Sequence, residues 1–475
     1  MNAREKYLAR LQKTRPVWVD GQKVTRLDTE PSFKGAIEII LRYYELLESD
    51  GFHFDYAGGI SAISLMTPRS PADLAKKRIA YQSVANLSFG MLGRTPDFMN
   101  AALCAMKSHA DFFGRGEFTD FSNNVNSFYD RCARDNLFIG HGAINPQIDR
   151  SKSLALQENA YVGVACTKTE AAGIRVSGAK MIVTLAPIAD ELLIFNMPGL
   201  SSADIDYALA FTVPTDAEGL KIICRKPLTH GSSSTFDYPL SSKIDEIDAY
   251  LVFEDVFIPW EDVFIFKDVE KSNRFYDITK TRHHTGHQGI VRGLAKAELL
   301  IGVADALAKN LGLSQFVNIQ EKIGELTTAY ELIRAAVIIT EVESEMDSQG
   351  VCNPRIASIQ AIRYHFPKWY QKMITTIQSL AAGSMLAVPH SQDFVNENEA
   401  CLSSALRNPF LSAKDRSHLL NLAWDVTGDG FGQRQMVYEN YHAGDPMRIA
   451  ATHYVNYDKT SMVNAVAQAL KPTAG

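Results

Sequence analysis

The stretch Met181-Ile182-Val183-Thr184-Leu185-Ala186-Pro187-Ile188-Ala189-Asp190-Glu191-Leu192-Leu193-Ile194-Phe195 decides the fold class of this chain. It follows the segment Ser177-Gly178-Ala179-Lys180, whose small and turn-forming residues predict a turn. Short runs of β-branched and aliphatic residues on either side of Pro187 predict strands. Long segments with apolar residues at helical spacing lie on both sides of this region. The pattern therefore predicts a small β-domain inserted into a helical protein.

The chain has 475 residues and a formal net charge of −6, and these two values limit the class of protein. A chain this long can bury a large core and predicts about two to four domains. The acidic balance argues against a general nucleic-acid-binding protein, because neutralising phosphates needs a basic surface. No apolar run approaches the roughly 18 residues that span a bilayer, so we expect no membrane segment.

The cysteines and the first residues both indicate a cytoplasmic protein. The polar stretch Met1-Asn2-Ala3-Arg4-Glu5-Lys6 lacks the apolar segment of a secretory signal. The cysteines are scattered and form no C-x-x-C pair, which predicts reduced, mostly buried thiols rather than a disulfide framework. There are six of them: Cys104, Cys132, Cys166, Cys224, Cys352 and Cys401.

Three segments of different pattern follow one another along the chain, and they predict an α+β protein. We expect an N-terminal helical domain at 1–144, a middle β-domain at 145–270 and a C-terminal helix bundle at 271–475. The helices expected in the first segment are 36–47, one that begins at Pro71 after Ser70, one that begins at Pro96 after Thr95, and 122–134.

Strands and then helices are expected in the rest of the chain. The middle segment has short β-branched and aromatic runs separated by Gly, Pro and Asp, and it favours a barrel or a sandwich. Its strand candidates are 161–165, 192–195, 208–213 and 250–253. Helical spacing returns at about Gly286 and fits a four-helix bundle. The long helices expected there are 294–311, 319–346 and 356–386.

The segment Gly93-Arg94-Thr95-Pro96-Asp97-Phe98-Met99-Asn100 places an arginine directly before a helix. A guanidinium held at such a junction can bind a phenolate or a carboxylate with two donors. The alternative is a surface arginine that pairs with Asp97, since short loop–helix junctions often hold such pairs. Arg94 is therefore a candidate binding residue with a purely structural alternative.

The segment His141-Gly142-Ala143-Ile144-Asn145-Pro146-Gln147-Ile148-Asp149-Arg150 marks the change from helices to strands. Near-neutral titration suits His141 to proton transfer or to a switchable hydrogen bond in a cleft between domains. The side-chain amides of Asn145 and Gln147 can form hydrogen bonds with the polar edge of a flavin, and Arg150 can face a pyrophosphate. The alternative is a linking turn whose histidine has its hydrogen bonds satisfied.

These two segments resemble those of the 4-hydroxyphenylacetate 3-monooxygenase oxygenase-component family, which also includes chlorophenol and other phenol hydroxylases. The likeness runs over nearly the whole chain, and several motifs in one order are more specific than any single motif. The other motifs are Gly178, Lys180 and Thr184; Val252-Phe253-Glu254-Asp255-Val256-Phe257-Ile258-Pro259-Trp260; His283-His284-Thr285-Gly286-His287-Gln288; Phe431-Gly432-Gln433-Arg434-Gln435; and Tyr438-Glu439-Asn440-Tyr441-His442-Ala443-Gly444-Asp445-Pro446.

The resemblance implies an acyl-CoA dehydrogenase-like fold and a two-component aromatic monooxygenase. FAD would arrive already reduced, as FADH2 from a separate NAD(P)H-dependent flavin reductase, and would react with O2 to a C4a-hydroperoxyflavin that hydroxylates a phenol or another aromatic substrate. The chain agrees in lacking a G-x-G-x-x-G between a strand and a helix, since Gly428-Asp429-Gly430-Phe431-Gly432 has the wrong spacing. The resemblance also implies a homotetramer.

The resemblance assigns roles to individual residues. Arg94 and His141 would contact the substrate hydroxyl, with Arg94 stabilising phenolate charge and His141 moving the proton. Thr184 would lie by the reactive edge of the flavin, although a lone strand threonine is usually structural. The family's hydroxyphenylacetate enzymes carry tyrosine four residues after this arginine, whereas this chain has Phe98. Phe98 would line the substrate site, and the substrate is expected to differ from 4-hydroxyphenylacetate or to bind without that hydroxyl.

The C-terminal motifs add further candidates. The chlorophenol branch uses a histidine near His283 as a base, so His283 is a second base candidate; its alternative is a histidine packed at a helix start. Three histidines within five residues can suggest a metal, but His284 lies about a hundred degrees round a helix from the other two, so we expect no metal site. Gln288 is expected to reach the flavin, as are the residues of the last turn, Tyr441, Gly444 and Asp445. That turn is alternatively an ordinary helix stop.

Three other functions compete with this interpretation. A 4-hydroxybutyryl-CoA dehydratase-like enzyme would need about four close cluster ligands, and only Cys104 lies near a relevant helix. An acyl-CoA dehydrogenase-like flavoenzyme or a flavin N-oxygenase would be a further possibility; the dehydrogenase needs a carboxylate over the flavin, for which Glu298 and Glu331 are the candidates. A scaffold protein without catalysis would not bind reduced FAD.

Overall fold

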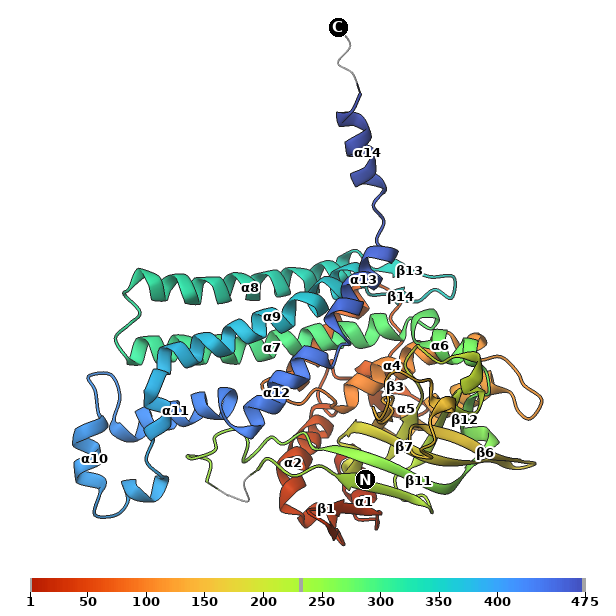
Figure 1. Ribbon diagram of the computed structural model, residues 1–475, viewed down its shortest axis with the longest axis horizontal. Coiled ribbons are helices and arrows are strands. Elements are labelled where there is room, and N and C mark those ends of the chain that lie inside the picture. Colours follow the sequence, from red (N-terminus) through yellow and green to blue (C-terminus); the bar gives the residue numbers. More distant parts are fainter. Residues whose placement is uncertain (1, 230–233, 472–475) are drawn as a thin grey trace.

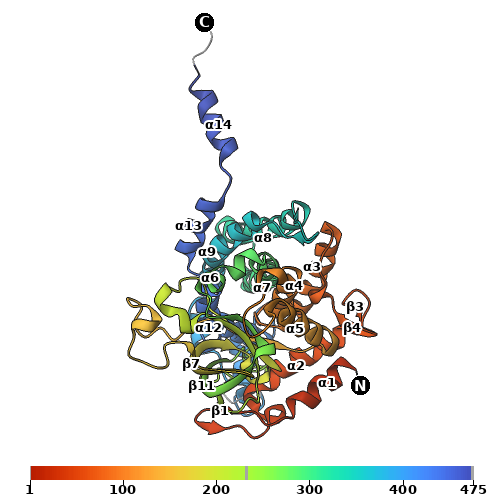
Figure 2. The same ribbon diagram turned by 90° about the vertical axis from the view of Figure 1, so that its right-hand side faces the viewer.

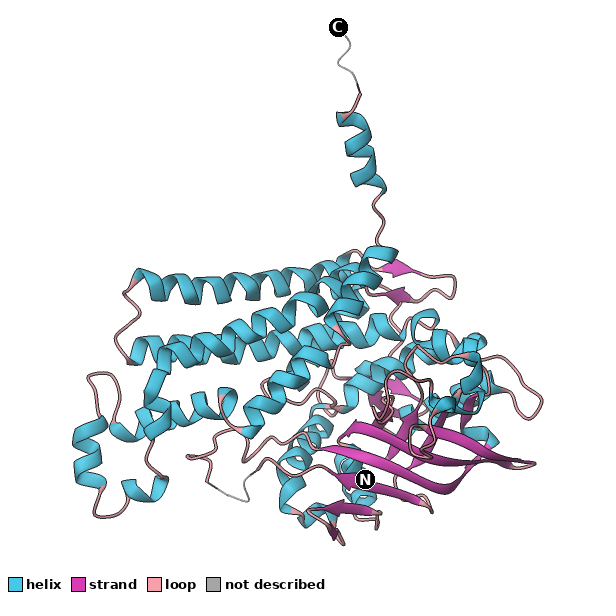
Figure 3. Cartoon of the chain, in the orientation of Figure 1, coloured by secondary structure: helices cyan, strands magenta, loops and turns pink. Residues whose placement is uncertain are grey.

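A computed structural model describes residues 2–229 and 234–471, so the last four residues of the expected C-terminal domain lie outside it. Figure 1 shows the strands gathered beside the N-terminal helices, with long helices extending away from both. The colouring of Figure 3 shows the same separation, apart from two short strands at the end of the long helices, Glu345–Met346 and Cys352–Asn353. The predicted order of helices, strands and helices is confirmed. No helix in the described ranges is long and apolar enough to cross a membrane.

Helices dominate the N-terminal part. Ser70 caps the helix that starts at Pro71 by accepting the Asp73 backbone N–H, as its sequence predicts. Asp120 caps the last helix of this part in the same way, through the Asn123 N–H. The elements are α1 (Ala3–Leu11), α2 (Pro31–Leu46), the hairpin β3 (His53–Tyr56) and β4 (Gly59–Ala62), α3 (Pro71–Asn86), α4 (Pro96–Ser108) and α5 (Phe121–Asp135).

The described strands of the middle region form two sheets. An isolated antiparallel bridge between Ile144 and Met181 connects them. The six-stranded sheet has the order β2 (Gln22–Lys23), β1 (Val17–Val19), β10 (Leu220–Cys224), β11 (Asp248–Pro259), β7 (Gly173–Thr184), β6 (Val164–Glu170). The four-stranded sheet has the order β12 (Val263–Phe266), β9 (Leu209–Pro214), β8 (Glu191–Ile194), β5 (Ile139–Gly142).

The turn expected at 177–180 is wrong, because these residues lie inside β7. Gly178 pairs with Val164 of β6 on one side and with Phe253 of β11 on the other. Its φ of +129° and the close approach of the Gly163 carbonyl leave no room for a Cβ. The glycine therefore serves a tight strand contact, and β7 continues to Thr184.

The C-terminal part begins with α6 (Val269–Ile278) and continues with three long helices. These are α7 (Thr281–Asn310), α8 (Val317–Val342) and α9 (Ile356–Ala381), with the short strands β13 (Glu345–Met346) and β14 (Cys352–Asn353) between the last two. The three helices pack lengthwise on one another, and α11 (Ala413–Thr427) packs on α7 and α9. The three predicted helices are confirmed, although α7 begins earlier than expected and both α8 and α9 end earlier.

The last helices carry the chain back across the molecule. α10 (Glu399–Leu406) precedes α11, and α12 (Gly430–Tyr441) follows it and packs on α9. α13 (Pro446–Asn456) and α14 (Thr460–Ala469) complete the chain. α14 projects from the body of the molecule in both views and has no buried residue (Figures 1 and 2).

Candidate active site

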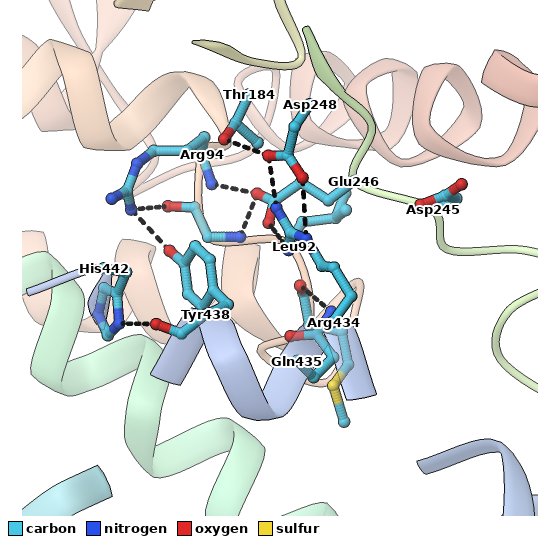
Figure 4. A network of polar contacts seen from close by, with 12 residues as sticks. Leu92, Arg94, Thr184, Asp245, Glu246, Asp248, Arg434, Gln435, Tyr438 and His442 are labelled. Carbon is cyan, nitrogen blue, oxygen red and sulfur yellow. Dashed lines mark hydrogen bonds and ion pairs between the residues drawn. The ribbon is translucent and has the colours of Figure 1, made fainter. Parts of the chain in front are cut away.

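Arg94 lies in the short loop before α4, and its backbone is fixed by a carboxylate from the β-region. Glu246 Oε1 accepts the N–H groups of Gly93 at 2.5 Å and of Arg94 at 2.7 Å. Glu246 Oε2 accepts a guanidinium N–H of Arg434 at 2.7 Å. The Glu246 side chain is fully buried, so these charge-assisted bonds hold the loop firmly. Figure 4 shows this carboxylate between the Arg94 loop and α12.

The guanidinium of Arg94 does not pair with Asp97. It donates to the Tyr438 hydroxyl at 2.7 Å and to the Gly93 carbonyl at 3.0 Å, and its Cζ lies 4.1 Å from the centre of the Phe98 ring. Asp97 is buried and instead accepts from Thr95 and Gln288. Burial raises the pKa of Asp97 to about 6. The half-buried Arg94 therefore keeps donors for another partner.

His141 lies on β5, and its ring is close to that of Phe98. Its ring centre is 5.4 Å from that of Phe98 and 6.2 Å from that of Phe195, which it stacks upon. Burial, and secondarily the charge of Arg94, lowers the pKa of His141 to about 3. The structure thus brings Arg94, Phe98 and His141 together as a cation, an apolar ring and a neutral imidazole.

Three flavin-binding candidates follow β5. Asn145 contacts a buried lysine, whereas Gln147 and Arg150 are exposed. Asn145 Oδ1 accepts from the buried Lys180 ammonium at 2.7 Å, and Asn196 Oδ1 accepts from the same group at 2.8 Å. Burial lowers the pKa of Lys180 to about 7. Gln147 and Arg150 are exposed, and no hydrogen bond or ion pair of their side chains is found within residues 2–229 and 234–471.

Thr184 ends β7 beside an ionic cluster. Its hydroxyl donates to Asp248 Oδ1 at 2.8 Å, and the Asp248 carboxylate binds the guanidinium groups of Arg225 and Arg434. These cations outweigh burial and hold the pKa of Asp248 below its usual value. The Thr184 oxygen keeps its acceptor capacity, because a hydroxyl can donate and accept at once. Figure 4 shows Thr184, Asp248 and Arg434 in one connected network with Arg94.

The three histidines of α7 point to three different partners. His283 Nδ1 lies 2.8 Å from the Pro354 carbonyl, His284 Nε2 lies 3.1 Å from Asn353 Oδ1, and His287 Nε2 lies 3.0 Å from Glu341 Oε1. Burial lowers the pKa of His283 to about 4. The part of the chain that the structure describes contains no group of three or more His, Cys, Asp or Glu side chains arranged to hold a metal.

The remaining candidates lie at α7 and at the end of α12. Gln288 is buried and donates to Asp97 at 3.2 Å, while its Oε1 has no hydrogen-bond partner in the described chain. Tyr441 is exposed. Gly444 has a φ of +111°, and Asp445 caps α13 by accepting the N–H of Met447 at 2.8 Å. The chain therefore ends α12 and begins α13 at this turn, and the flavin contacts expected of its residues stay a prediction.

Sequence reasoning assigned no role to Glu246, Asp248, Arg434 and Tyr438, which hold the Arg94 loop. The last two lie four residues apart on α12 and so share one face of that helix. This spacing is a signal that the sequence offers. The two carboxylates precede or begin β11, and only the folded chain brings them to α12.

Comparison with known proteins gives a consistent result over the whole chain. The family models described as 4-hydroxyphenylacetate 3-hydroxylase N terminal and C terminal match residues 3–265 and 272–471. The 4-hydroxyphenylacetate 3-monooxygenase oxygenase component of Thermus thermophilus is 35% identical over 453 residues, which cover 94% of this chain and 93% of the relative.

Solved structures agree. The crystal structure of an oxygenase component of 4-hydroxyphenylacetate 3-monooxygenase, complexed with FAD and 4-hydroxyphenylacetate, has a TM-score of 0.93 and 33% identity. It covers 99% of this chain and 98% of that chain. An archaeal 4-hydroxybutyryl-CoA dehydratase from N. maritimus has a TM-score of 0.87 over 100% of this chain and 96% of its own, but only 20% identity, and so shares the fold alone.

The helical lobe, the β-region and the helix bundle, with Arg94 and His141 where the first two meet, define the acyl-CoA dehydrogenase-like class of proteins. Within that class, the matches of both family models and of the Thermus relative are decisive. The chain belongs to the 4-hydroxyphenylacetate 3-hydroxylase family.

Proposed function

We propose that this protein is the oxygenase component of a two-component monooxygenase, which uses FADH2 and O2 to hydroxylate a phenol. The observation that carries the proposal is the cluster of Arg94, Phe98 and His141, which offers a cation and a neutral imidazole beside an apolar ring. Family membership and the FAD-bound relative support the same reaction.

Arg94 and His141 have different roles toward the phenol: Arg94 stabilises its negative charge, and His141 accepts its proton. A phenol has a pKa of about 10 in water, and a guanidinium at hydrogen-bond distance favours the phenolate. Negative charge on the phenolate oxygen spreads to the ortho carbon and makes it the nucleophile. His141 is neutral at neutral pH, so it can accept the phenol proton in a hydrogen bond without repelling Arg94. Phe98 holds the substrate ring by stacking.

We assign His141 the proton-transfer role ahead of His283. The Pro354 carbonyl accepts from His283 Nδ1, which leaves only Nε2 for another partner. No contact among the described residues links His283 to Arg94, Phe98 or His141. His283 remains the second candidate, at the start of α7.

The residues present fit a reduced flavin. When bound, the flavin supplies the electrons that activate dioxygen. The Thr184 oxygen can accept an N–H of a reduced flavin while it donates to Asp248. The unpartnered Oε1 of Gln288 and the Asn145 amide are further polar groups for a flavin edge. For the rest of the cofactor we propose the exposed side chains of Gln147, Arg150 and Tyr441, together with Gly444 and Asp445.

The partners proposed for the chain follow from the same activity. The flavin arrives reduced from a separate NAD(P)H-dependent reductase, in the cytoplasm. We propose a homotetramer, because α13 and α14 present apolar side chains that their own chain leaves exposed. These side chains are Met447, Tyr454, Val455, Met462, Val463 and Val466.

A coupled assay tests the function. The protein is mixed with a generic flavin reductase, NADH, FAD and a panel of phenols that includes 4-hydroxyphenylacetate, and products are identified by mass. Arg94→Ala and His141→Ala should each lower hydroxylated product and raise hydrogen peroxide. Arg115→Ala, which removes an exposed arginine paired with Asp120, is the matched control. Wild-type coupling in both site variants would contradict the roles given to Arg94 and His141.

A further inference from the structure

Tyr438 contacts Arg94 from the C-terminal part of the chain. It lies on α12, 344 residues away in sequence, and its hydroxyl oxygen is 2.7 Å from the Arg94 guanidinium. The approach depends on Gly93, since a Cβ at that position would overlap the Tyr438 hydroxyl. A contact that requires a glycine on the partner loop places the hydroxyl tightly beside Arg94.

The ring of Tyr438 is held by a stack and a buried ionic cluster. His442 stacks on it at 4.4 Å between ring centres with an interplanar angle of 5°. Arg292 and Lys296 lie 5.3 and 5.4 Å from its ring centre. Both cations bind the fully buried Glu439, the next residue along α12. These contacts fix the orientation of the phenol ring without using its hydroxyl proton.

The Tyr438 hydroxyl can still donate a hydrogen bond. Its oxygen accepts from Arg94, so its own hydrogen points elsewhere, and no acceptor for it occurs in the described residues. Burial raises the pKa of Tyr438, which keeps the hydroxyl protonated at neutral pH. Phe98, whose ring lies against the same guanidinium, has no hydroxyl. Tyr438 is therefore the phenolic donor that this chain places beside Arg94.

We propose that Tyr438 is a substrate-binding residue, whose hydroxyl donates a hydrogen bond to the phenolate oxygen that Arg94 holds. The inference rests on the proposed function, because it needs a phenol at Arg94. It assigns to α12 a direct part in selecting substrates with an ionisable hydroxyl. A donor at this point favours the phenolate over the neutral phenol and over rings without a hydroxyl.

The test uses 4-nitrophenol, whose phenolate form is coloured, with the protein and reduced FAD under anaerobic conditions. Tyr438→Phe keeps the ring and removes one oxygen. We expect about tenfold weaker binding of 4-nitrophenolate and a rise of about one unit in the pKa of the bound phenol. Affinity for reduced FAD should not change. Tyr250→Phe, which alters an exposed tyrosine of β11, is the control and should match wild type.

A second variant separates hydroxyl chemistry from helix packing. Phe98→Tyr combined with Tyr438→Phe returns a hydroxyl to the same guanidinium, and we expect it to recover most of the lost affinity and the lowered phenol pKa. Unchanged or tighter binding in Tyr438→Phe would overturn the inference, because the hydroxyl would then be idle or would compete with the ligand. Failure of wild type to bind reduced FAD would instead reject the proposed function.

Discussion

Glu246 joins the Arg94 loop to α12 through one buried carboxylate. Its replacement should weaken the attachment of the loop to the helix and so destabilise the fold. Its Oε1 accepts the N–H groups of Gly93 and Arg94, and its Oε2 accepts from Arg434. Glu246→Gln preserves the shape of the side chain but leaves one acceptor oxygen and introduces an N–H2 group. Whichever way the amide turns, it directs donors at donors, and at least one buried N–H loses its acceptor.

The structure sets the size of the effect. The Glu246 side chain is fully buried, so water cannot replace the lost acceptor. Removing one partner of a buried ion pair destabilises a protein by about 3–5 kcal/mol. Arg434 keeps its two bonds to Asp248, so its charge is not left alone. We therefore expect the lower end, a loss of about 3 kcal/mol in the free energy of unfolding.

Urea unfolding at one fixed protomer concentration measures this loss. Glu254→Gln is the matched control, because it removes an exposed carboxylate that pairs with Lys221 at 2.7 Å. The control should change the free energy of unfolding by less than about 1 kcal/mol. If Glu246→Gln and Glu254→Gln unfold at the same urea concentration, the carboxylate does not hold the loop, and the reasoning about Arg94 fails.

Three further predictions concern pH and packing. His141 has a folded pKa of about 3 against 6.5 unfolded, so the protein should lose stability as pH falls from 6.5 to 3, and His141→Gln should flatten this dependence in unfolding experiments. Lys180 has a folded pKa of about 7 against 10.5, so stability should rise with pH between these values; a rise of equal slope in Lys180→Met would contradict the assignment. Gly93→Ala displaces the Tyr438 hydroxyl, so it should weaken 4-nitrophenol binding about tenfold, and adding Tyr438→Phe should weaken it no further.

Local signals in the sequence predicted most of the elements. Ser70 before Pro71 predicted a helix start that the structure confirms, because capping depends on residues only a few positions apart. The strands before and after Pro187 followed from β-branched and aliphatic residues in the same way. The sequence did not predict β1 and β2, since strands of three and two residues carry no periodic pattern. They form by pairing, β1 with β10 and β2 with β1. The turn at 177–180 was wrong because Gly178 serves a strand contact.

The residues of the candidate site likewise fall into those that local sequence indicates and those that only the folded chain reveals. Arg94 and His141 were found because each lies in a motif of neighbouring residues, and the structure places both against Phe98. Tyr438 and Glu246 were not, because their positions beside Arg94 depend on the packing of α12 and β11 rather than on local sequence. The sequence shows that Arg434 and Tyr438 share one face of a helix, but it does not show which loop or strand that face contacts.

Isotopically labelled dioxygen tests the oxygenase assignment most directly. A separate reductase supplies the protein with reduced FAD, and 4-hydroxyphenylacetate or another accepted phenol is added under the labelled dioxygen. Mass spectrometry then gives the mass of the product. We expect one labelled oxygen atom in an ortho-dihydroxylated ring, with the other released as water. A product that carries unlabelled oxygen, or peroxide formation with every phenol of the panel left intact, would contradict the assignment.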